Sequence, residues 1–174
     1  MKSKIRSIPE LKSEVGRLKA LGRVVVFTNG CFDLLHAGHV RYLADARAQG
    51  NALVVGVNSD ASVRAIKGPD RPLVPQDQRI EVVAALESVT FATLFDEETP
   101  EALIRELLPQ VLVKGADWPE DKIAGAAAVK AAGGRVVSVP LTGGLSTTGI
   151  IRKVLETFGK NPEALTELTD KGCE

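Results

Sequence analysis

The chain has 174 residues, of which 44% are hydrophobic and 25% charged, a balance typical of one globular domain that excludes disordered and fibrous proteins. Lysine plus arginine and aspartate plus glutamate both number 22, so no net charge draws the protein to nucleic acid or to an anionic membrane surface. No apolar run is long enough to span a bilayer, and the first residues lack the apolar core of a signal peptide. We therefore expect a cytoplasmic protein with no nucleic-acid or membrane partner.

The predicted elements alternate between helix and strand along the chain. Apolar residues at helical spacing predict a leading helix over residues 8–21, and RVVVFTN, residues 23–29, predicts a strand buried on both faces. Further helices are expected at 37–49, 76–86 and 100–108 and in an alanine-rich stretch, and further strands at 52–58, 89–95, 111–115 and 135–140. Five strands alternating with helices predict an α/β fold: a single Rossmann-like, doubly wound domain with a five-stranded parallel sheet.

In such a fold, ligands bind at the carboxyl ends of the strands. We expect residues 1–22 to form the leading helix, residues 23–158 the domain itself and residues 159–174 a polar C-terminal tail. The two cysteines, Cys31 and Cys173, lie far apart, so neither a disulfide nor a zinc site is expected from them. A nucleophilic role for Cys31 is the alternative to a small buried residue, but the sequence fixes no base beside it.

The most informative segment is GCFDLLHAGHVRYL, residues 30–43, which forms the first strand-to-helix turn. His36 and His39 are three residues apart, so they share one face of a helix start, and Gly38 between them lets a phosphate approach the backbone. Unpaired amides and the helix dipole favour an anion at the same place. The segment therefore predicts a phosphate site. Structural histidines are one alternative; a zinc pair is another, although only Asp33 is near as a further ligand.

Three more segments carry candidate ligand groups. The stretch 66–79 is predicted to be a loop whose cations, Lys67, Arg71 and Arg79, grip phosphates, with scattered surface charge as the alternative. Lys114, Gly115 and Asp117 follow the fourth strand and should face the site, and Trp118 either stacks near a base or packs in the core. Ser146 or Thr147 is predicted to cap a helix, and the run Ser146, Thr147, Thr148 offers donors to nucleotide phosphates.

Taken in order, five segments resemble the nucleotidyltransferase superfamily with the HxGH signature, in particular its ADP-heptose-forming adenylyltransferases. They are GCFDLLHAGH, GVNSDASVRAIKGPDRP, RIEVVAALESV, VLVKGADW and LSTTGII, and the likeness covers about residues 5–157. The resemblance implies transfer of AMP from ATP to D-glycero-β-D-manno-heptose 1-phosphate, with pyrophosphate released and the product used for lipopolysaccharide. It also implies a stand-alone form served by a separate sugar kinase, and a homodimer.

The resemblance further implies a role for each matching residue. His36, His39 and Lys67 are expected to be catalytic. The acceptor is expected to contact Asp33, Asn58, Arg71 and Arg79. No permanent metal is implied; Mg²⁺ accompanies ATP, with Asp33 as a candidate contact. The nucleotide is expected to contact Gly30, Cys31, Phe32, Gly38, Lys114, Gly115, Asp117, Ser146, Thr147 and Thr148.

Two departures from the relatives bear on the substrate. Cytidylyltransferase relatives carry Arg-Thr-Glu-Gly where this chain has Leu141 to Gly144, so their phosphate-binding arginine is missing, which argues against a glycerol 3-phosphate acceptor. Ala116 stands where heptose relatives commonly have glycine. The alternatives are a transferase of the same fold with CTP or another phosphorylated acceptor, and an inactive nucleotide-binding regulatory domain.

Overall fold

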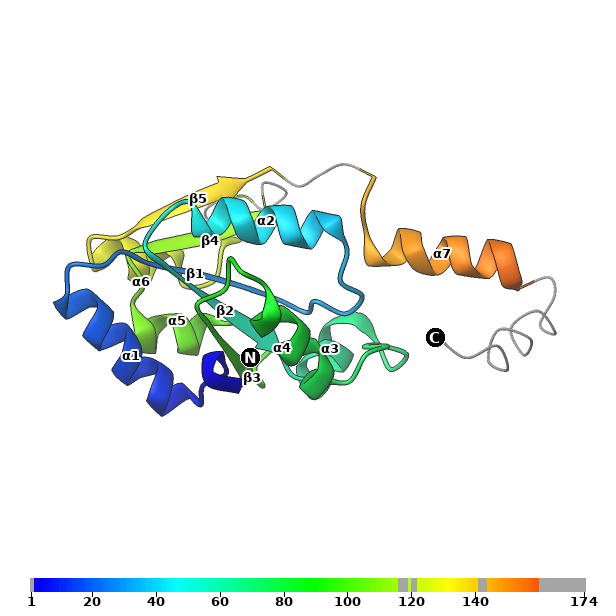
Figure 1. Ribbon diagram of the computed structural model, residues 1–174, viewed down its shortest axis with the longest axis horizontal. Helices are drawn as coiled ribbons and strands as arrows, with labels where there is room; N and C mark the ends of the chain where they lie inside the picture. Colours follow the sequence, from blue (N-terminus) through cyan, green and yellow to red (C-terminus); the bar gives the residue numbers. More distant parts are fainter. Residues whose placement is uncertain (1, 116–118, 120–121, 141–143, 160–174) are drawn as a thin grey trace. The chain divides into compact units, whose positions relative to one another are not determined.

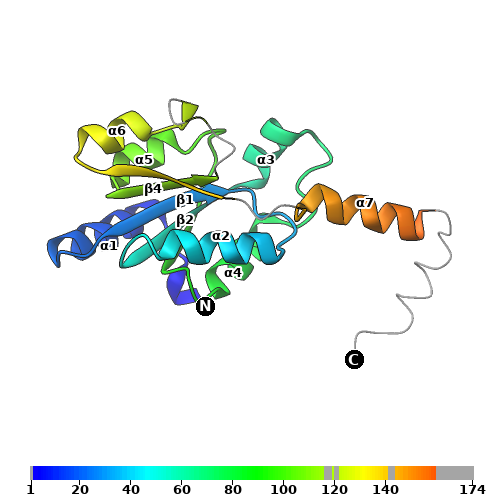
Figure 2. The same cartoon turned by 90° about the horizontal axis from the view of Figure 1, so that it is seen from above.

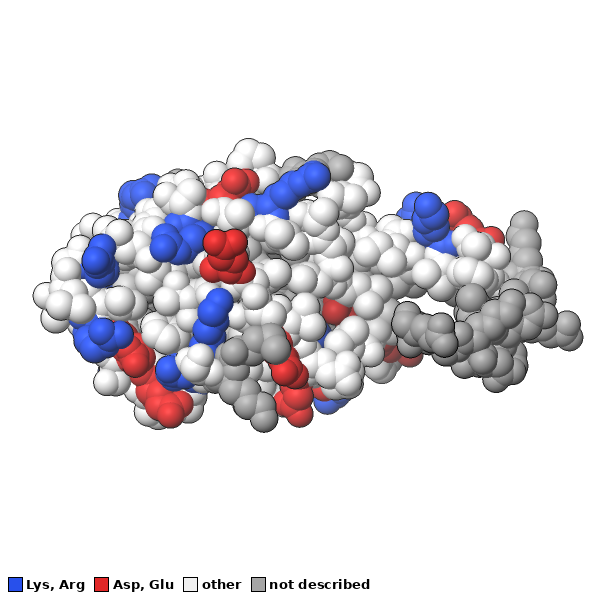
Figure 3. Space-filling model, viewed as in Figure 1, with Lys and Arg blue, Asp and Glu red and all other residues white. Residues whose placement is uncertain are grey.

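The computed structural model describes residues 2–115, 119, 122–140 and 144–159. The chain divides into two compact units, Met1–Thr142 and Gly143–Glu174. Within the part of the chain that is described, no helix has both the length and the apolar composition needed to cross a membrane. On the face shown in Figure 3, acidic and basic side chains are interspersed, in keeping with a net charge of zero.

The first unit is built on a parallel sheet of five strands in the order β3-β2-β1-β4-β5 (Figure 1). Its strands are β1 (Val25–Gly30), β2 (Ala52–Asn58), β3 (Phe91–Phe95), β4 (Val111–Gly115) and β5 (Arg135–Val139). The chain runs outward from β1 to β3 and then returns to place β4 against the other side of β1. The predicted doubly wound α/β fold is confirmed, and its switch point lies between β1 and β4.

Helices cover both faces of this sheet (Figure 2). Buried residues of α1 (Ile8–Ala20), α5 (Glu101–Leu107) and α6 (Ala126–Ala131) form one core with the residues of β1, β2 and β4 that face these helices. Buried residues of α2 (Ala37–Arg47) and α4 (Gln76–Ala85) form the other core. Both cores consist mainly of valine, leucine, isoleucine and alanine, as the scarcity of aromatic residues requires.

The segment after β2 differs from its prediction. The stretch 66–79 was predicted as a loop, which overlapped the helix predicted at 76–86. Lys67 is the last residue of a helix, α3 (Asp60–Lys67), that was not predicted, whereas Arg79 lies within α4, which confirms the predicted helix. The side-chain oxygen of Ser59 accepts a hydrogen bond from the Ser62 amide at 3.2 Å, which caps the start of α3. The true loop is therefore residues 68–75, and a helix holds the lysine that precedes it.

The described part of the second unit begins with a capped helix, α7 (Thr147–Phe158). Ser146 precedes the helix in extended conformation, and its hydroxyl oxygen accepts a hydrogen bond from the Gly149 amide at 3.0 Å. The predicted cap is thus confirmed at Ser146. The sequence pattern sufficed here because the capping bond spans only three residues.

The two-layer core predicts that truncating Leu112, a fully buried residue of β4, destabilises the protein. Leu112→Ala should lower the free energy of unfolding by about 2–5 kcal/mol, because the vacated volume is closed on all sides. Urea unfolding measures this loss. Leu21→Ala is the control, since Leu21 is 63% exposed, and it should change the same quantity by less than about 0.5 kcal/mol. Equal effects of the two changes would contradict the described core.

Candidate active site

The chain reverses sharply where β1 ends, and this reversal builds the site. Phe32 adopts a left-handed conformation with φ 46°, and its ring is buried. A Cβ atom on Gly30 would lie 3.0 Å from that ring, so glycine lets the aromatic side chain pack closely against the end of β1 without shifting. A buried hydrogen bond of 2.7 Å between Thr28 Oγ1 and Tyr42 OH then ties α2 to β1. The start of α2 is therefore fixed at the carboxyl edge of the sheet.

The structure brings the two histidines together at this helix start. Their rings stack with centroids 3.9 Å apart and an interplanar angle of 22°, while Phe32 meets His39 edge-on at 5.4 Å. The His36 amide donates to Nδ1 of His39 at 3.4 Å. A neutral ring that accepts at Nδ1 carries its proton on Nε2, so Nε2 is the hydrogen-bond donor of His39. Nδ1 of His36 is buried with no hydrogen-bond partner among the described residues.

Burial, together with smaller contributions from the nearby His36 and Lys67, lowers the pKa of His39 from 6.5 to about 4. At neutral pH the His39 imidazole is consequently uncharged. The influence of Lys67 also shows that the end of α3 lies near the histidine pair. A phosphate group at this place would be met by a neutral imidazole donor, the helix start and a lysine ammonium group.

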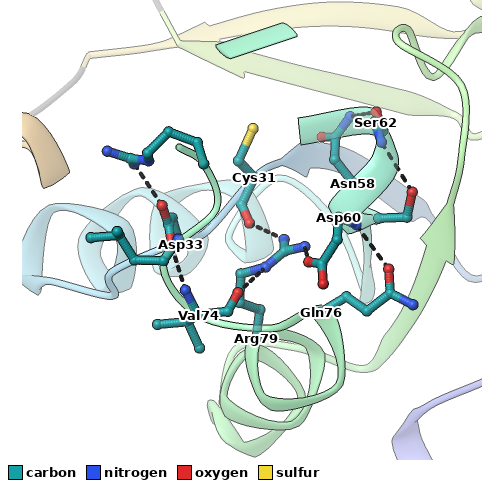
Figure 4. Close-up of polar contacts among 11 residues, drawn as sticks. Cys31, Asp33, Asn58, Asp60, Ser62, Val74, Gln76 and Arg79 are labelled. Carbon is teal, nitrogen blue, oxygen red and sulfur yellow. Dashed lines mark hydrogen bonds and ion pairs between the residues drawn. The ribbon is translucent and has the colours of Figure 1, made fainter. Parts of the chain in front are cut away.

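Asp33 anchors the loop of residues 68–75 to this turn. The carboxylate is buried, and its Oδ1 atom accepts hydrogen bonds from the amides of Leu73 at 2.8 Å and Val74 at 3.0 Å. Its Oδ2 atom forms an ion pair of 2.7 Å with the guanidinium of Arg71 (Figure 4). Both oxygens are thus engaged by the protein, which leaves Asp33 poorly placed for the Mg²⁺ or acceptor contact expected from the sequence.

Arg79 is also engaged inside the protein. Its side chain is 0% exposed and donates from Nε to the Val74 carbonyl at 2.9 Å, from Nη1 to the Cys31 carbonyl and from Nη2 to Asp60 Oδ1 at 2.8 Å. From the resemblance, this guanidinium was expected to face the acceptor. In the structure the guanidinium is instead buried and binds three protein groups, in the turn at Cys31, in the loop at Val74 and at the start of α3.

Asn58 is likewise buried and bonded to the protein. It is 2% exposed and donates from Nδ2 to Ser62 Oγ at 2.9 Å, and the Ser62 hydroxyl in turn donates a hydrogen bond to the Glu97 carbonyl at 2.7 Å. The side chain therefore joins β2 to α3, and an acceptor contact is not visible at this atom. Cys31 contributes its carbonyl, and its thiol is free and half-buried.

The end of β4 lies beside the end of β1, which leads into the turn of residues 30–39 that carries both histidines, here called the histidine turn. Lys114 donates from Nζ to Asn29 Oδ1 at 2.6 Å, which connects β4 with the last turn-facing residues of β1. Gly115 is the buried last residue of β4. Asp117 and Trp118 lie outside the described residues. Ser146, Thr147 and Thr148 belong to the second unit, at the start of α7.

Sequence reasoning missed three residues of this site. Asp60 and Gln76 link the starts of α3 and α4, since the Asp60 amide donates to Gln76 Oε1 at 2.8 Å. Asn29 holds Lys114. The available signal for Asn29 was its polar side chain at the end of an otherwise apolar strand. Among the residues that the structure describes, no three His, Cys, Asp or Glu side chains gather to hold a metal ion, so nothing there supports the zinc alternative.

Comparison with known proteins finds a family model and curated relatives that match most of this chain. Residues 27–153 match the family model described as cytidylyltransferase-like. The curated relatives include the bifunctional protein HldE of Trichlorobacter lovleyi, 51% identical over 90% of this chain and 32% of the relative. The HldE protein of Geobacter sulfurreducens is 48% identical over 91% of this chain and 32% of the relative. The chain therefore spans about a third of the length of these relatives.

Among solved structures, the lipopolysaccharide core biosynthesis protein from Thermoplasma volcanium GSS1 has the same fold. It superposes with a TM-score of 0.57 and is 27% identical, covering 70% of this chain and 98% of that chain. Nearly the whole of that protein thus superposes on part of this chain, which shows that the two share the fold.

The low pKa of His39 is open to direct measurement. NMR titration of the imidazole nitrogens should show one ring with a pKa of about 4 in the folded protein, against the ordinary histidine pKa of 6.5. Because the pKa is lower in the folded than in the unfolded chain, protonation favours unfolding. Stability should therefore be complete above pH 6.5 and fall as the pH approaches 4.

His39→Gln is the variant that isolates this effect, because glutamine is polar and does not titrate. Urea unfolding at pH 7 and pH 4.5 should show a smaller pH-dependent loss of stability in the variant than in the natural chain. Identical losses, together with an imidazole pKa near 6.5, would show that His39 is not buried as described.

Proposed function

Because the chain belongs to the cytidylyltransferase-like family, we propose that it transfers AMP from ATP to D-glycero-β-D-manno-heptose 1-phosphate, giving ADP-heptose and pyrophosphate. The observation that carries this proposal is the stacked histidine pair at the start of α2, with Lys67 close enough to alter the His39 pKa. This arrangement supports phosphoryl chemistry, because it concentrates donors and positive potential at one point of the sheet edge.

The choice of acceptor rests on sequence similarity. The five segments that resemble ADP-heptose-forming enzymes include the turn after β1, α3 with its loop, most of α4, β4 with the residues after it, and the start of α7. The HldE relatives are named bifunctional, and this chain corresponds to about a third of their length, which fits one of two activities. The name of the structural neighbour from Thermoplasma volcanium concerns lipopolysaccharide core biosynthesis, which is consistent with a heptose acceptor.

The proposed reaction is a direct displacement at phosphorus. A phosphate oxygen of the acceptor attacks the α-phosphorus of ATP, the bond to the bridging oxygen breaks, and pyrophosphate leaves with the bonding electron pair. His36 and His39 donate hydrogen bonds to phosphoryl oxygens as negative charge shifts toward the leaving group. Lys67, at the end of α3, supplies a positive charge to the same oxygens. The protein contributes positioning and charge stabilisation, and it forms no covalent intermediate.

Mg²⁺ enters this scheme as part of the MgATP substrate. Both Asp33 oxygens have protein partners, so the ion is held by phosphate oxygens and water, as is usual for Mg²⁺ at nucleotides. We place the base near Lys114 and Gly115 and the acceptor near Arg71. The proposal also includes a cytoplasmic location, a homodimer and a separate sugar kinase that supplies the acceptor.

The function is tested by pyrophosphate release with MgATP and a panel of acceptors. We expect release with the β anomer of the heptose 1-phosphate, and little with its α anomer, glycerol 3-phosphate, flavin mononucleotide or nicotinate mononucleotide. Replacing ATP by CTP should lower the rate at least about tenfold, which is about 1.4 kcal/mol of discrimination. Activity with another acceptor or a preference for CTP would overturn the named substrate, and ATP binding without turnover for any acceptor would point to a regulatory domain.

His39→Ala should lower turnover by about a hundredfold or more, because it removes one donor to the developing charge. Steady-state pyrophosphate release measures this change. Val40→Ala serves as the control, since Val40 neighbours His39 on α2 but is 43% exposed, and it should keep turnover within about twofold. Near-normal turnover of His39→Ala would remove the histidine pair from the mechanism.

A further inference from the structure

One buried guanidinium joins four segments of the chain around the candidate active site. Arg79 lies in the first turns of α4 and donates to the Cys31 carbonyl in the histidine turn, the Val74 carbonyl in the loop and Asp60 at the start of α3 (Figure 4). Each of its three donating nitrogens has a different segment as partner. Only an arginine side chain has the planar set of donors that this geometry requires.

Asp60, at the start of α3, is bonded to α4 through both its side chain and its backbone. The Asp60 carboxylate accepts from Arg79 of α4 at 2.8 Å, while the Asp60 amide donates to Gln76 Oε1 of α4 at 2.8 Å. The starts of the two helices are therefore held together by two independent bonds. Since α3 is a helix of 8 residues that ends at Lys67, fixing its start also fixes the place of that lysine.

The same arginine acts on the histidine turn through the backbone. The Cys31 carbonyl that it binds precedes Phe32, whose left-handed conformation turns the chain toward His36. Asp33, on the other side of Phe32, holds the amides of Leu73 and Val74. Arg79 and Asp33 thus restrain the turn on both sides of the residue at which it reverses.

A role in stability alone would not need this arrangement. A buried ion pair is seldom more stabilising than apolar side chains of the same volume, because both charges lose their hydration. What the pair adds is a defined geometry among the segments it joins. Here those segments carry Lys67 and the two histidines, and the relative positions of these three groups decide how they bind phosphate oxygens.

We propose that Arg79 is a positioning residue for nucleotidyl transfer, which sets the placement of Lys67 relative to His36 and His39 and touches neither substrate. The kinetic part of this inference rests on the function proposed above. The structural part does not, because it concerns the histidine turn of the protein without substrate.

The test is Arg79→Lys, which keeps the positive charge beside Asp60 but cannot reach three segments at once. Arg105→Lys is the matched control, because Arg105 also donates two hydrogen bonds to a carboxylate, that of Glu101, on the exposed surface of α5. Both variants are measured well below their melting temperatures. The readouts are kcat, the KM values for ATP and acceptor, and imidazole NMR, which reports on this turn alone since His36 and His39 are the only histidines.

For Arg79→Lys we expect kcat to fall at least about tenfold while both KM values stay within about threefold, because the reacting groups are misplaced rather than lost. The His39 signal should move, and the pKa of His39 should rise from about 4 toward 6.5 as the turn opens and Lys67 moves away. Arg105→Lys should leave all of these quantities at their natural values.

Other outcomes would overturn the inference. Unchanged kcat with unchanged imidazole signals would make Arg79 a stability residue, whatever its melting temperature. Moved imidazole signals with unchanged kcat would show that the placement does not matter for transfer. A raised KM for the acceptor alone, with imidazole signals as in the natural chain, would show direct acceptor contact instead.

Two further variants keep the test decisive if Arg79→Lys does not fold. Asp60→Asn weakens the link to α3 at a side chain that is 25% exposed, and Gln76→Ala removes the reciprocal bond. Both should lower kcat and move the His39 signal in the same direction but by less; natural values in both would overturn the proposal. If the natural chain is inactive with every acceptor, the proposed function fails, while the NMR comparison still decides whether Arg79 holds the turn.

Discussion

The reversal of the chain at Phe32 is the constraint on which the site depends. A parallel strand ends in unpaired backbone groups at the sheet edge, and the following helix must begin there for its amides to meet a ligand. Phe32 achieves this turn in a left-handed conformation that disfavours a bulky side chain, so other contacts must hold it. Gly30 leaves room for the ring, and the partners of Cys31 and Asp33 secure the backbone on either side.

Electrostatic attraction in this protein is local, because the whole chain has no net charge. Burial keeps His39 neutral beside Lys67, so several positive charges are not crowded together at this place. The neutral imidazole still offers a hydrogen bond, and the positive potential comes from the helix start and the lysine. A polyanion placed here would offset the repulsion among these groups. The arrangement thus suits a ligand whose charge increases at one end during reaction.

The fold and the histidine pair could be read from the sequence because both depend on short-range patterns. Buried strands are continuous apolar runs, and residues three apart on a helix share a face. The helix α3 was missed because its 8 residues run directly into a proline-containing loop with the same charged character. Arg79 was misplaced for another reason: a charged residue suggests exposure, and its burial depends on partners as distant as Cys31, 48 residues away. No local pattern encodes such contacts.

The polar network around the turn ends mainly on backbone groups. Asp33 binds two loop amides, and Arg79 binds two carbonyls, so only one partner of each is a charged side chain. Backbone groups cannot change rotamer, so a network that ends on them transmits position between segments more rigidly than one between two mobile side chains. The loop of residues 68–75 is therefore held near its anchors at Asp33 and Val74. Arg71 extends from this held loop, which places its guanidinium within reach of the turn before any ligand arrives.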